Sequence, residues 1–335
     1  MSSKKCKRLA IIGCGGFVRG HVRTIVKEVP EFEFAGLVEP SPEKLQEFRK
    51  ELPKGADPPV FDNHEKMLAE VKPDAVIVST PHTLHFRHAC DSILAGAHVM
   101  VEKPMVTNSG DARRLVAAAE ENKRVLQIAI QGTYTDTFAY TRKLLTDGTI
   151  GPLQLVTGML AQGWMKATKG MWRQDPKLSG GGQLYDSTAH VLSAMMFLVD
   201  SPVVEAFCRT DNKSSRVDIN AVGCILFENG CMGTITSGGD CAAFYSHLVL
   251  QGENALVEIS PHGGSFRIAG KGLDENITAV PKGWDIPTVA PVRNFADAIA
   301  GKAEPRCGGR VGILLADLMD ALYESADTGG PVRVG

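Results

Sequence analysis

A lysine lies at the end of an apolar segment whose pattern is typical of a strand inside a parallel sheet. Val99-Met100-Val101 runs directly into Glu102-Lys103-Pro104. Burying a lysine is costly unless its charge is paired or neutralised, so a lysine where a central strand ends suggests a chemical task. Open α/β sheets bind ligands at the carboxyl ends of their strands. Lys103 is therefore a candidate catalytic residue, although a surface lysine in a strand-to-helix loop is the simpler interpretation of these six residues alone.

A second group of polar residues follows a run of glycines in the later part of the chain. Gly180-Gly181-Gly182 precedes Asp186 and His190. A helix opening near Leu184 would turn Asp186 and His190 to the same side, because residues four apart are neighbours on a helix. The glycines would leave room for a ligand, and polar groups on an otherwise apolar helix need partners. An Asp-His pair that satisfies itself in the core is an equally good interpretation.

A strand, a glycine-rich turn and a helix come early in the chain, in the order that a dinucleotide-binding site needs. A buried strand is expected over 8–12 and a helix over 19–29, on either side of the glycine turn. The first glycine permits a tight turn, the second lets the backbone approach a pyrophosphate, and the helix start offers unpaired N–H groups to the anion. A valine replaces the third glycine of the usual fingerprint. We expect cofactor contacts from Gly13, Gly15, Gly16, Phe17 and Val18.

The next predicted strand, over 34–38, ends at Glu39. This residue follows the glycine turn by about 20 residues, where a carboxylate can accept both ribose hydroxyls of an adenosine. Such a carboxylate would also repel a 2′-phosphate, and no arginine follows it in Pro40-Ser41-Pro42. The predicted cofactor is therefore NAD, with NADP as the alternative. The simpler interpretation of Glu39 is a solvated residue at a strand end.

Three histidines stand at a spacing of three where the third buried strand, over 75–79, gives way to a helix. They are His82, His85 and His88, and they follow Thr80-Pro81. The first and third lie well apart around a helix, and no cysteine or glutamate completes a tetrahedral set, so no metal site is predicted. A histidine near the helix start that touches the cofactor is the better hypothesis.

The order of strands and helices predicts two domains. A doubly wound parallel sheet, a Rossmann domain, is expected over 1–131, because strands and helices alternate as far as a strand over 125–130. An α+β domain with a large, mostly antiparallel open sheet is expected over 132–335, because later strands follow one another through short turns such as 228–230. One face of that sheet needs cover, which predicts a homodimer or homotetramer.

Composition narrows the class of protein further. The chain has 335 residues, enough for about two domains, and its 44% hydrophobic and 22% charged residues are typical of an ordinary globular protein. A net charge of −2 without a basic block argues against a nucleic-acid partner. No apolar run is long enough to span a membrane or to form the core of a signal peptide. The eight cysteines include no C-x-x-C pair, so we expect reduced thiols and a cytoplasmic location.

Taken in order, these residues resemble the glucose-fructose oxidoreductase and inositol dehydrogenase family, often written Gfo/Idh/MocA. The resemblance extends to two closing helices around 294–299 and 321–326, and so covers essentially the whole chain. The motifs that carry it are the glycine turn at 13–18, Thr80-Pro81 with His85, Glu102-Lys103-Pro104, Trp172-Arg173, Gly180 to Gly182, and Asp186 with His190.

The resemblance implies an NAD(P) enzyme that moves a hydride between nicotinamide and a hydroxyl-bearing carbon of a sugar, cyclitol or related polyol. By position, Lys103 would contact the nicotinamide ribose and the substrate hydroxyl, His190 would be the general acid or base, and Asp186 would orient the substrate or His190. The resemblance also implies a cis peptide bond before Pro104. It adds Thr80, Pro81, His85 and Glu102 to the cofactor contacts, and Trp172, Arg173 and Tyr185 to the substrate contacts.

Two functions other than a dehydrogenase remain open within this resemblance. Some relatives keep NAD tightly bound and cleave glycosidic bonds by transient oxidation, using the same three residues. Others bind a dinucleotide and regulate partner proteins without turnover, and these commonly lose the lysine or the histidine. The segment after Ile130, where many relatives carry an arginine, is Gln131-Gly132-Thr133 here, so the substrate's identity stays open.

Overall fold

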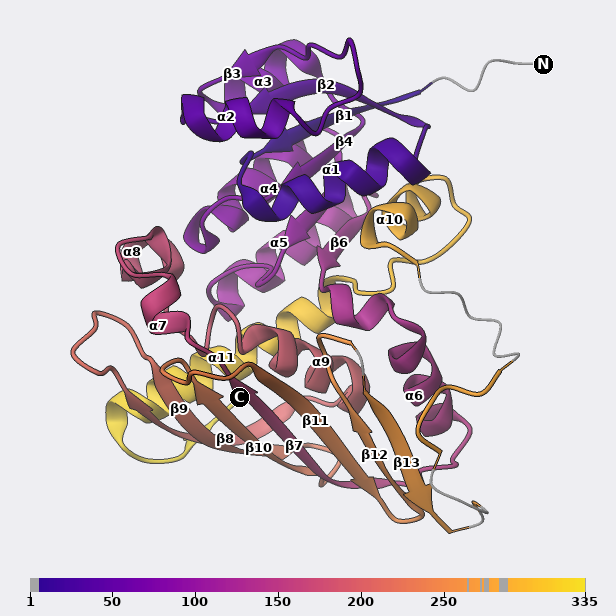
Figure 1. The fold of residues 1–335 in the computed structure, drawn as a ribbon, viewed down its shortest axis with the longest axis vertical. Helices are drawn as coiled ribbons and strands as arrows, with labels where there is room; N and C mark the ends of the chain where they lie inside the picture. The colour runs from indigo at the N-terminus through magenta and orange to yellow at the C-terminus, as the bar shows by residue number, and fades with distance from the viewer. Residues whose placement is uncertain (1–5, 264, 272, 274–276, 283–288, 335) are drawn as a thin grey trace. The chain divides into compact units, whose positions relative to one another are not determined.

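The chain forms two units in the computed structural model, which describes residues 6–334 apart from 264, 272, 274–276 and 283–288 (Figure 1). The first unit runs to Ala129 and also takes in Val289–Gly309. The second begins at Ile130 and resumes at Arg310. The sequence predicts a continuous second domain, 132–335, whereas the segment 289–309 packs with the first unit. The packing of this segment with the first unit depends on contacts between residues far apart in the sequence, which local patterns do not encode.

The sheet of the first unit is the predicted doubly wound sheet. All of its six strands are parallel, and their order is β3-β2-β1-β4-β5-β6. Its central strand β4 is apolar throughout and fully buried, because helices cover both faces of such a sheet. The strands are β1 (Lys7–Ile12), β2 (Phe32–Val38), β3 (Val60–Phe61), β4 (Ala75–Val78), β5 (His98–Glu102) and β6 (Leu126–Ala129).

Helices follow the strands of this sheet, as the alternating pattern predicts. The side chain of Asn108 accepts a hydrogen bond of 2.8 Å from the backbone N–H of Asp111, which is an N-cap that starts the fifth helix. The helix after the glycine turn begins at Gly16, three residues earlier than expected. The helices are α1 (Gly16–Glu28), α2 (Pro42–Arg49), α3 (His64–Val71), η1 (His82–Leu84), α4 (His85–Leu94), α5 (Ser109–Glu121) and α10 (Pro291–Ile299).

The second unit is built on the predicted large sheet, which has eight strands in the order β13-β12-β11-β7-β10-β9-β8-β14. The pair β7 and β10 is parallel and the other neighbours are antiparallel. The strands are β7 (Leu153–Ala161), β8 (Val203–Asp211), β9 (Asn220–Phe227), β10 (Met232–Gly238), β11 (Tyr245–Gly252), β12 (Ala255–Ile259), β13 (Phe266–Gly270) and β14 (Val332–Arg333).

Helices of the second unit lie on one face of this sheet (Figure 1). Most residues of α9 are buried against the strands, and α11 contributes Leu315, Leu318 and Leu322 to the same core. Burial of this apolar face supplies much of the driving force for folding the unit. The helical elements are η2 (Gln131–Tyr134), α6 (Asp136–Thr146), α7 (Trp164–Ala167), η3 (Trp172–Gln174), α8 (Pro176–Ser179), α9 (Ala189–Val199) and α11 (Gly309–Thr328).

The opposite face of the eight-stranded sheet carries exposed apolar side chains. Along β7, β9 and β10 exposed and buried residues alternate, so every second side chain points away from the helices. Register places Met232 beside both Leu226 and Leu155, and Thr236 beside both Val222 and Met159. We call this surface the open sheet face; its exposed apolar residues are Leu155, Met159, Val222, Leu226 and Met232.

Within the described residues, none of the helices has both the length and the apolar character needed to cross a membrane.

Candidate active site

The glycine turn places its glycines as a dinucleotide site requires. Gly13 has φ +91°, and a Cβ atom there would lie 2.5 Å from the carbonyl oxygen of Ser79, so the turn admits no side chain. Gly15 is the N-cap of α1 and contributes no capping side chain. A Cβ atom on Gly15 would meet no atom within 4 Å, so its backbone faces open space. The start of α1 therefore carries no capping side chain and presents the positive end of the helix dipole, which suits an anion.

The other members of the predicted turn take different positions. Gly16 and Phe17 are exposed at the start of α1. Val18 is fully buried in the core, where the usual fingerprint has a glycine, so only its backbone could contact a cofactor.

Glu39 lies at the carboxyl end of β2, beside the glycine turn. One carboxylate oxygen accepts a hydrogen bond from the backbone N–H of Cys14 and the other accepts one from Ser41, both at 2.9 Å. Two backbone donors therefore fix the orientation of this buried carboxylate. Each oxygen keeps a further lone pair that could accept from a ribose hydroxyl.

Lys103 follows β5 at the carboxyl edge of the same sheet, and it is 7% exposed. The peptide bond between Lys103 and Pro104 is cis, as predicted. Glu102, the last residue of β5, lies 2.8 Å from the Nε2 atom of His21 on α1. The turn that carries Lys103 is thus connected to α1 through Glu102.

Thr80 and Pro81 lie in the loop after β4, at the same edge of the sheet, and both are partly exposed. His85 is different: it is 0% exposed, and its ring nitrogens lie 2.7 Å from the carbonyl oxygen of Pro104 and 2.9 Å from that of Thr80. Both ring nitrogens therefore face backbone carbonyls, and the imidazole offers no free edge to a cofactor. This corrects the expectation of a direct contact, because burial of the ring is a tertiary outcome.

The residues of the first unit fit a bound NAD. The donors at the start of α1 suit a pyrophosphate, the open space above Gly15 admits it, and the acceptors of Glu39 suit a ribose. Lys103 lies at the sheet edge where the nicotinamide half would end.

In the second unit Asp186 is held by two donors. The indole Nε1 of Trp164 lies 2.8 Å from its Oδ2 atom, and the guanidinium Nε of Arg173 lies 3.0 Å from the same atom. The Arg173 guanidinium also covers the ring of Trp172, 4.5 Å from its centroid. Asp186 is buried, so this ion pair offsets the cost of its desolvation. Of the five predicted site residues in this unit, Trp172, Arg173 and Asp186 thus form one cluster.

The segment that carries Asp186 and His190 differs from the prediction. Residues 183–188 form turns, and α9 begins only at Ala189, so Asp186 precedes the helix on which His190 lies. The hydrogen bond from the backbone N–H of Asp186 to the Gly182 carbonyl closes one turn, but the next bonds change spacing. A continuous helix from Leu184 is therefore wrong, and the four-residue spacing does not place both side chains on one helical face.

The glycine run is filled by the protein itself. A Cβ atom on Gly182 would lie 1.9 Å from the Asp218 carbonyl oxygen, and one on Gly181 would lie 2.3 Å from the Tyr323 hydroxyl. The Asp218 carboxylate accepts hydrogen bonds from the backbone N–H groups of Gly182 and Leu184, and from the Tyr323 hydroxyl. Gly181 and Gly182 thus serve close packing, and the expectation that they leave room for a ligand is corrected.

His190 stands in the first turn of α9, partly exposed. Its ring lies edge-on to that of His262, with centroids 4.9 Å apart, and the Nδ1 atom of His262 is 2.8 Å from the Ser246 hydroxyl. Tyr185, a predicted substrate contact, is instead buried and stacks on Tyr323 at 5.8 Å. Burial raises the pKa of Tyr185 above its ordinary value, so its phenol stays neutral.

Sequence reasoning missed four residues that organise these groups: His21, Trp164, Asp218 and His262. None belongs to a motif of recognisable spacing, and each acts on a segment far from it in the chain.

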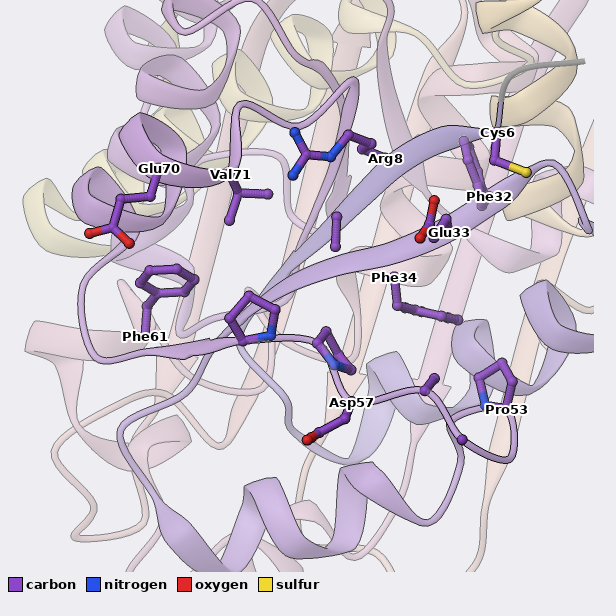
Figure 2. Close-up of a pocket in the computed structure, with 15 residues that line it drawn as sticks. Cys6, Arg8, Phe32, Glu33, Phe34, Pro53, Asp57, Phe61, Glu70 and Val71 are labelled. Carbon is purple, nitrogen blue, oxygen red and sulfur yellow. The ribbon is translucent and has the colours of Figure 1, made fainter.

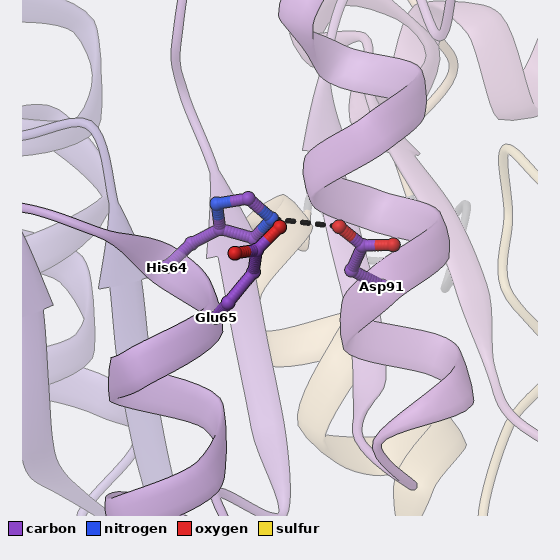
Figure 3. Close-up of side chains that lie close together, drawn as sticks. All are labelled: His64, Glu65 and Asp91. Atoms are coloured by element: carbon purple, nitrogen blue, oxygen red, sulfur yellow. Dashed lines mark hydrogen bonds and ion pairs between the residues drawn. The ribbon is translucent and has the colours of Figure 1, made fainter.

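One group of potential metal ligands occurs among the described residues, and it lies apart from the glycine turn. His64 on α3 is 2.7 Å from Asp91 on α4, with Glu65 beside them (Figure 3). Arg87 pairs with both carboxylates, so a cationic side chain of the protein already contacts two of the three groups. Of the three histidines at spacing three, His85 holds the carbonyls described above and the Nδ1 atom of His88 is 3.0 Å from the Thr80 hydroxyl.

A surface pocket of about 790 Å³ lies at the amino ends of the parallel strands, opposite the edge that carries the glycine turn (Figure 2). Arg8 and Phe32 mark the amino ends of β1 and β2 in its lining, whereas Gly13 and Glu39 follow the carboxyl ends of those strands. Because parallel strands end at one edge, this pocket is separate from the predicted cofactor site.

The parallel sheet and the glycine turn define a dinucleotide-binding domain, and comparison with known families shows that the chain is an oxidoreductase. Residues 7–130 match the oxidoreductase family with an NAD-binding Rossmann fold, and residues 138–258 match the GFO/IDH/MocA C-terminal domain. The chain therefore belongs to the Gfo/Idh/MocA family of oxidoreductases.

Individual relatives are distant. The D-glucoside 3-dehydrogenase of Escherichia coli (strain K12) is 24% identical over 316 residues, which cover 82% of this chain and 83% of the relative. The NADP⁺ scyllo-inositol 2-dehydrogenase of Bacillus subtilis (strain 168) is 25% identical over 159 residues, which cover 48% of this chain and 43% of the relative. The WlbA dehydrogenase of Bordetella pertussis, solved with NADH and UDP-GlcNAcA, superposes with a TM-score of 0.83 at 23% identity and covers 100% of this chain and 99% of its own.

Proposed function

We propose that this protein transfers a hydride between a nicotinamide cofactor and a hydroxyl-bearing carbon of a sugar, cyclitol or related polyol. The observation that carries the proposal is Lys103, a nearly buried lysine at the carboxyl edge of the sheet that also carries the glycine turn and Glu39. The names of the relatives, a glucoside dehydrogenase and an inositol dehydrogenase, support polyhydroxylated substrates. When bound, the nicotinamide supplies the group that accepts or donates the hydride.

Lys103 and His190 divide the proton and charge chemistry in this proposal. Oxidising an alcohol removes its hydroxyl proton as the hydride leaves, and a histidine suits that task at neutral pH. The Lys103 ammonium donates a hydrogen bond to the substrate oxygen as negative charge develops there. Asp186, already paired with Arg173, acts as a fixed carboxylate that orients the substrate or His190 and takes no proton itself.

A preference for NAD over NADP follows from Glu39. Both of its oxygens are fixed by backbone donors, so the carboxylate cannot turn away from a 2′-phosphate. Repulsion between the two negative charges would disfavour NADP.

Turnover with a panel of sugars and cyclitols, followed by NADH absorbance, tests the proposal. We expect Lys103→Ala and His190→Ala each to lower kcat at least ~100-fold, as loss of an electrostatic or acid-base group does, while NAD affinity stays within a few-fold. Because both residues serve one reaction, the double variant should lose little more than either single variant. Near-wild-type turnover in either single variant would defeat the assignment.

NADH absorbance, combined with a measurement of aglycone release from glycosides, separates the two other functions. Release of an aglycone from glycosides without net NADH would indicate a glycosidase that oxidises its substrate transiently. Cofactor binding without turnover on any substrate class would favour a regulator.

We also propose that the open sheet face joins copies of this chain into a homodimer or homotetramer. Exposed apolar residues occupy three neighbouring strands on that face, and larger contiguous apolar surfaces mark association sites. A cytoplasmic location completes the proposal, supported by eight cysteines that are all free thiols.

A further inference from the structure

The turn that carries Lys103 is held from both sides by buried histidines of the first unit. We infer that His21 and His85 are positioning residues that fix this turn, so that the Lys103 ammonium reaches a single place at the sheet edge. The inference rests on the proposed function of Lys103. It assigns a role that the sequence motifs do not give: His21 belongs to none of them, and His85, predicted as a cofactor contact, is fully buried.

His21 holds the residue that precedes Lys103. It lies on α1, the helix that starts from the glycine turn, and its Nε2 atom is 2.8 Å from the Glu102 carboxylate. Burial alone would raise the pKa of Glu102, but the hydrogen bond to His21 and the nearby charges of His21 and Lys103 hold this pKa below its ordinary value. Glu102 therefore stays ionised and accepts the bond, so the Nε2 atom of His21 is the donor.

His85 holds the residue that follows Lys103. Its Nδ1 atom is 2.7 Å from the carbonyl oxygen of Pro104, and its Nε2 atom is 2.9 Å from that of Thr80. Burial lowers the pKa of His85 more than its two backbone contacts raise it, so the ring is neutral near pH 7. A neutral imidazole donates only one hydrogen bond. We assign the proton to Nδ1, the nitrogen with the shorter contact, which makes Pro104 the residue held.

Together the two imidazoles restrain Lys103 from two directions. Glu102 is tied to the helix of the glycine turn, and Pro104 is tied to the start of α4. The two contacts therefore restrain the backbone on either side of Lys103. Since a misplacement of about 1 Å can lower a rate ~100-fold, this restraint bears directly on catalysis.

The chain offers a matched control for a buried histidine that bonds a carboxylate. His64 is buried and its Nε2 atom lies 2.7 Å from Asp91, a bond much like that of His21. Asp91 lies on α4, away from the end of β5. Loss of the His64 bond should therefore change stability without moving the Lys103 turn.

Asparagine and glutamine variants distinguish the two ring nitrogens, because the asparagine amide nitrogen occupies the place of Nδ1 and the glutamine amide nitrogen reaches the place of Nε2. At His21, glutamine should keep kcat within about threefold, and asparagine should lower it at least about tenfold. At His85 the order should reverse, so that asparagine keeps kcat and glutamine lowers it. A structural role alone predicts lower melting temperatures without opposite preferences, as expected for His64→Asn, whose kcat should stay within about twofold.

A second readout needs no turnover. Reductive methylation with ¹³C labels each lysine as a dimethylamine that gives an NMR signal. The signal of Lys103 is the one missing from the spectrum of Lys103→Arg. We expect His21→Asn and His85→Gln to move this signal toward the position of exposed lysines, and His64→Asn to leave it in place. The NADH dissociation constant, measured by fluorescence, should change no more than a few-fold in all variants.

The two readouts separate failure of the inference from failure of the proposed function. If Lys103→Ala inactivates the enzyme while His21→Asn and His85→Gln behave like His64→Asn, the inference is overturned and the function stands. If the wild-type protein turns over no substrate, the proposed function fails, and the Lys103 signal still decides whether the histidines hold the turn.

Discussion

Glu39 shows how a single carboxylate acquires a role from its backbone partners. A free strand-end glutamate would rotate among several conformers and lose entropy on binding a ligand. Here the N–H groups of Cys14 and Ser41 already hold both oxygens, so the orienting cost is met by the fold. The fixed charge is then available both to bind a ribose and to reject a phosphate.

The residue-scale prediction is a change of cofactor preference. Glu39→Ala should weaken NAD binding about tenfold, the effect of losing charge-assisted hydrogen bonds worth about 1.4 kcal/mol, and should weaken NADP binding less. Dissociation constants for both cofactors, measured by NADH and NADPH fluorescence, check it. Glu39→Gln, which keeps an acceptor but removes the charge, should chiefly improve NADP binding. An unaltered ratio of the two constants in Glu39→Ala would refute the role of this carboxylate.

At the scale of elements, α4 and β5 carry histidines that the fold keeps neutral. Burial lowers the pKa of His88 to about 4, with the neighbouring His64 adding to the effect. Burial also lowers the pKa of His98 to about 4, helped by the charge of Arg124. The Nδ1 atom of His98 accepts a hydrogen bond from the Val125 N–H, which requires that nitrogen to be unprotonated.

A pH dependence of stability follows with a definite sign. In the unfolded chain these histidines titrate near pH 6.5. Between about pH 6.5 and about pH 4 they are therefore protonated in the unfolded state and neutral in the folded state. The free energy of unfolding should therefore fall as pH decreases through this window, and stay unaffected by these groups above it. Thermal unfolding at a series of pH values checks this. His98→Asn, which retains an acceptor without titrating there, should show a smaller fall, and an equal fall would contradict the assignment.

At the scale of the whole molecule, the open sheet face leaves large apolar side chains exposed. Buried and exposed residues alternate along its strands, because the helices cover only the other face. Val222 and Met232 are 53% and 55% exposed there. Covering such side chains with the same face of a second copy would remove apolar surface from water in a symmetric, closed assembly.

Charged substitutions on that face test the proposed assembly. Val222→Glu and Met232→Glu would each place like charges near one another in a symmetric interface, and should raise the dissociation constant at least about tenfold. Light scattering with size-exclusion chromatography measures the mass over a range of concentrations. Leu94→Glu, at a 62% exposed position on α4, is the matched control and should leave the mass as in wild type. Variants on the sheet face that keep the wild-type mass would rule this interface out.

The sequence by itself determined those features that depend on residues close together in the chain. Alternating strands and helices, the glycine turn, the cap at Asn108 and the antiparallel hairpin at 228–230 all follow from periodicity and turn chemistry, which act over short separations. The order of motifs then predicted the family and its cofactor.

Only the tertiary structure decided how the site residues are held. His21 meets Glu102 across 81 residues, Trp164 meets Asp186 across 22, and Tyr323 meets Asp218 across 105. The same long-range contacts bury His85 and fill the glycine run that the sequence suggested for a ligand. Such pairs form only when whole elements pack, because a side chain's partner is set by the competition of all burial and hydrogen-bonding demands in the fold, and not by the residues beside it.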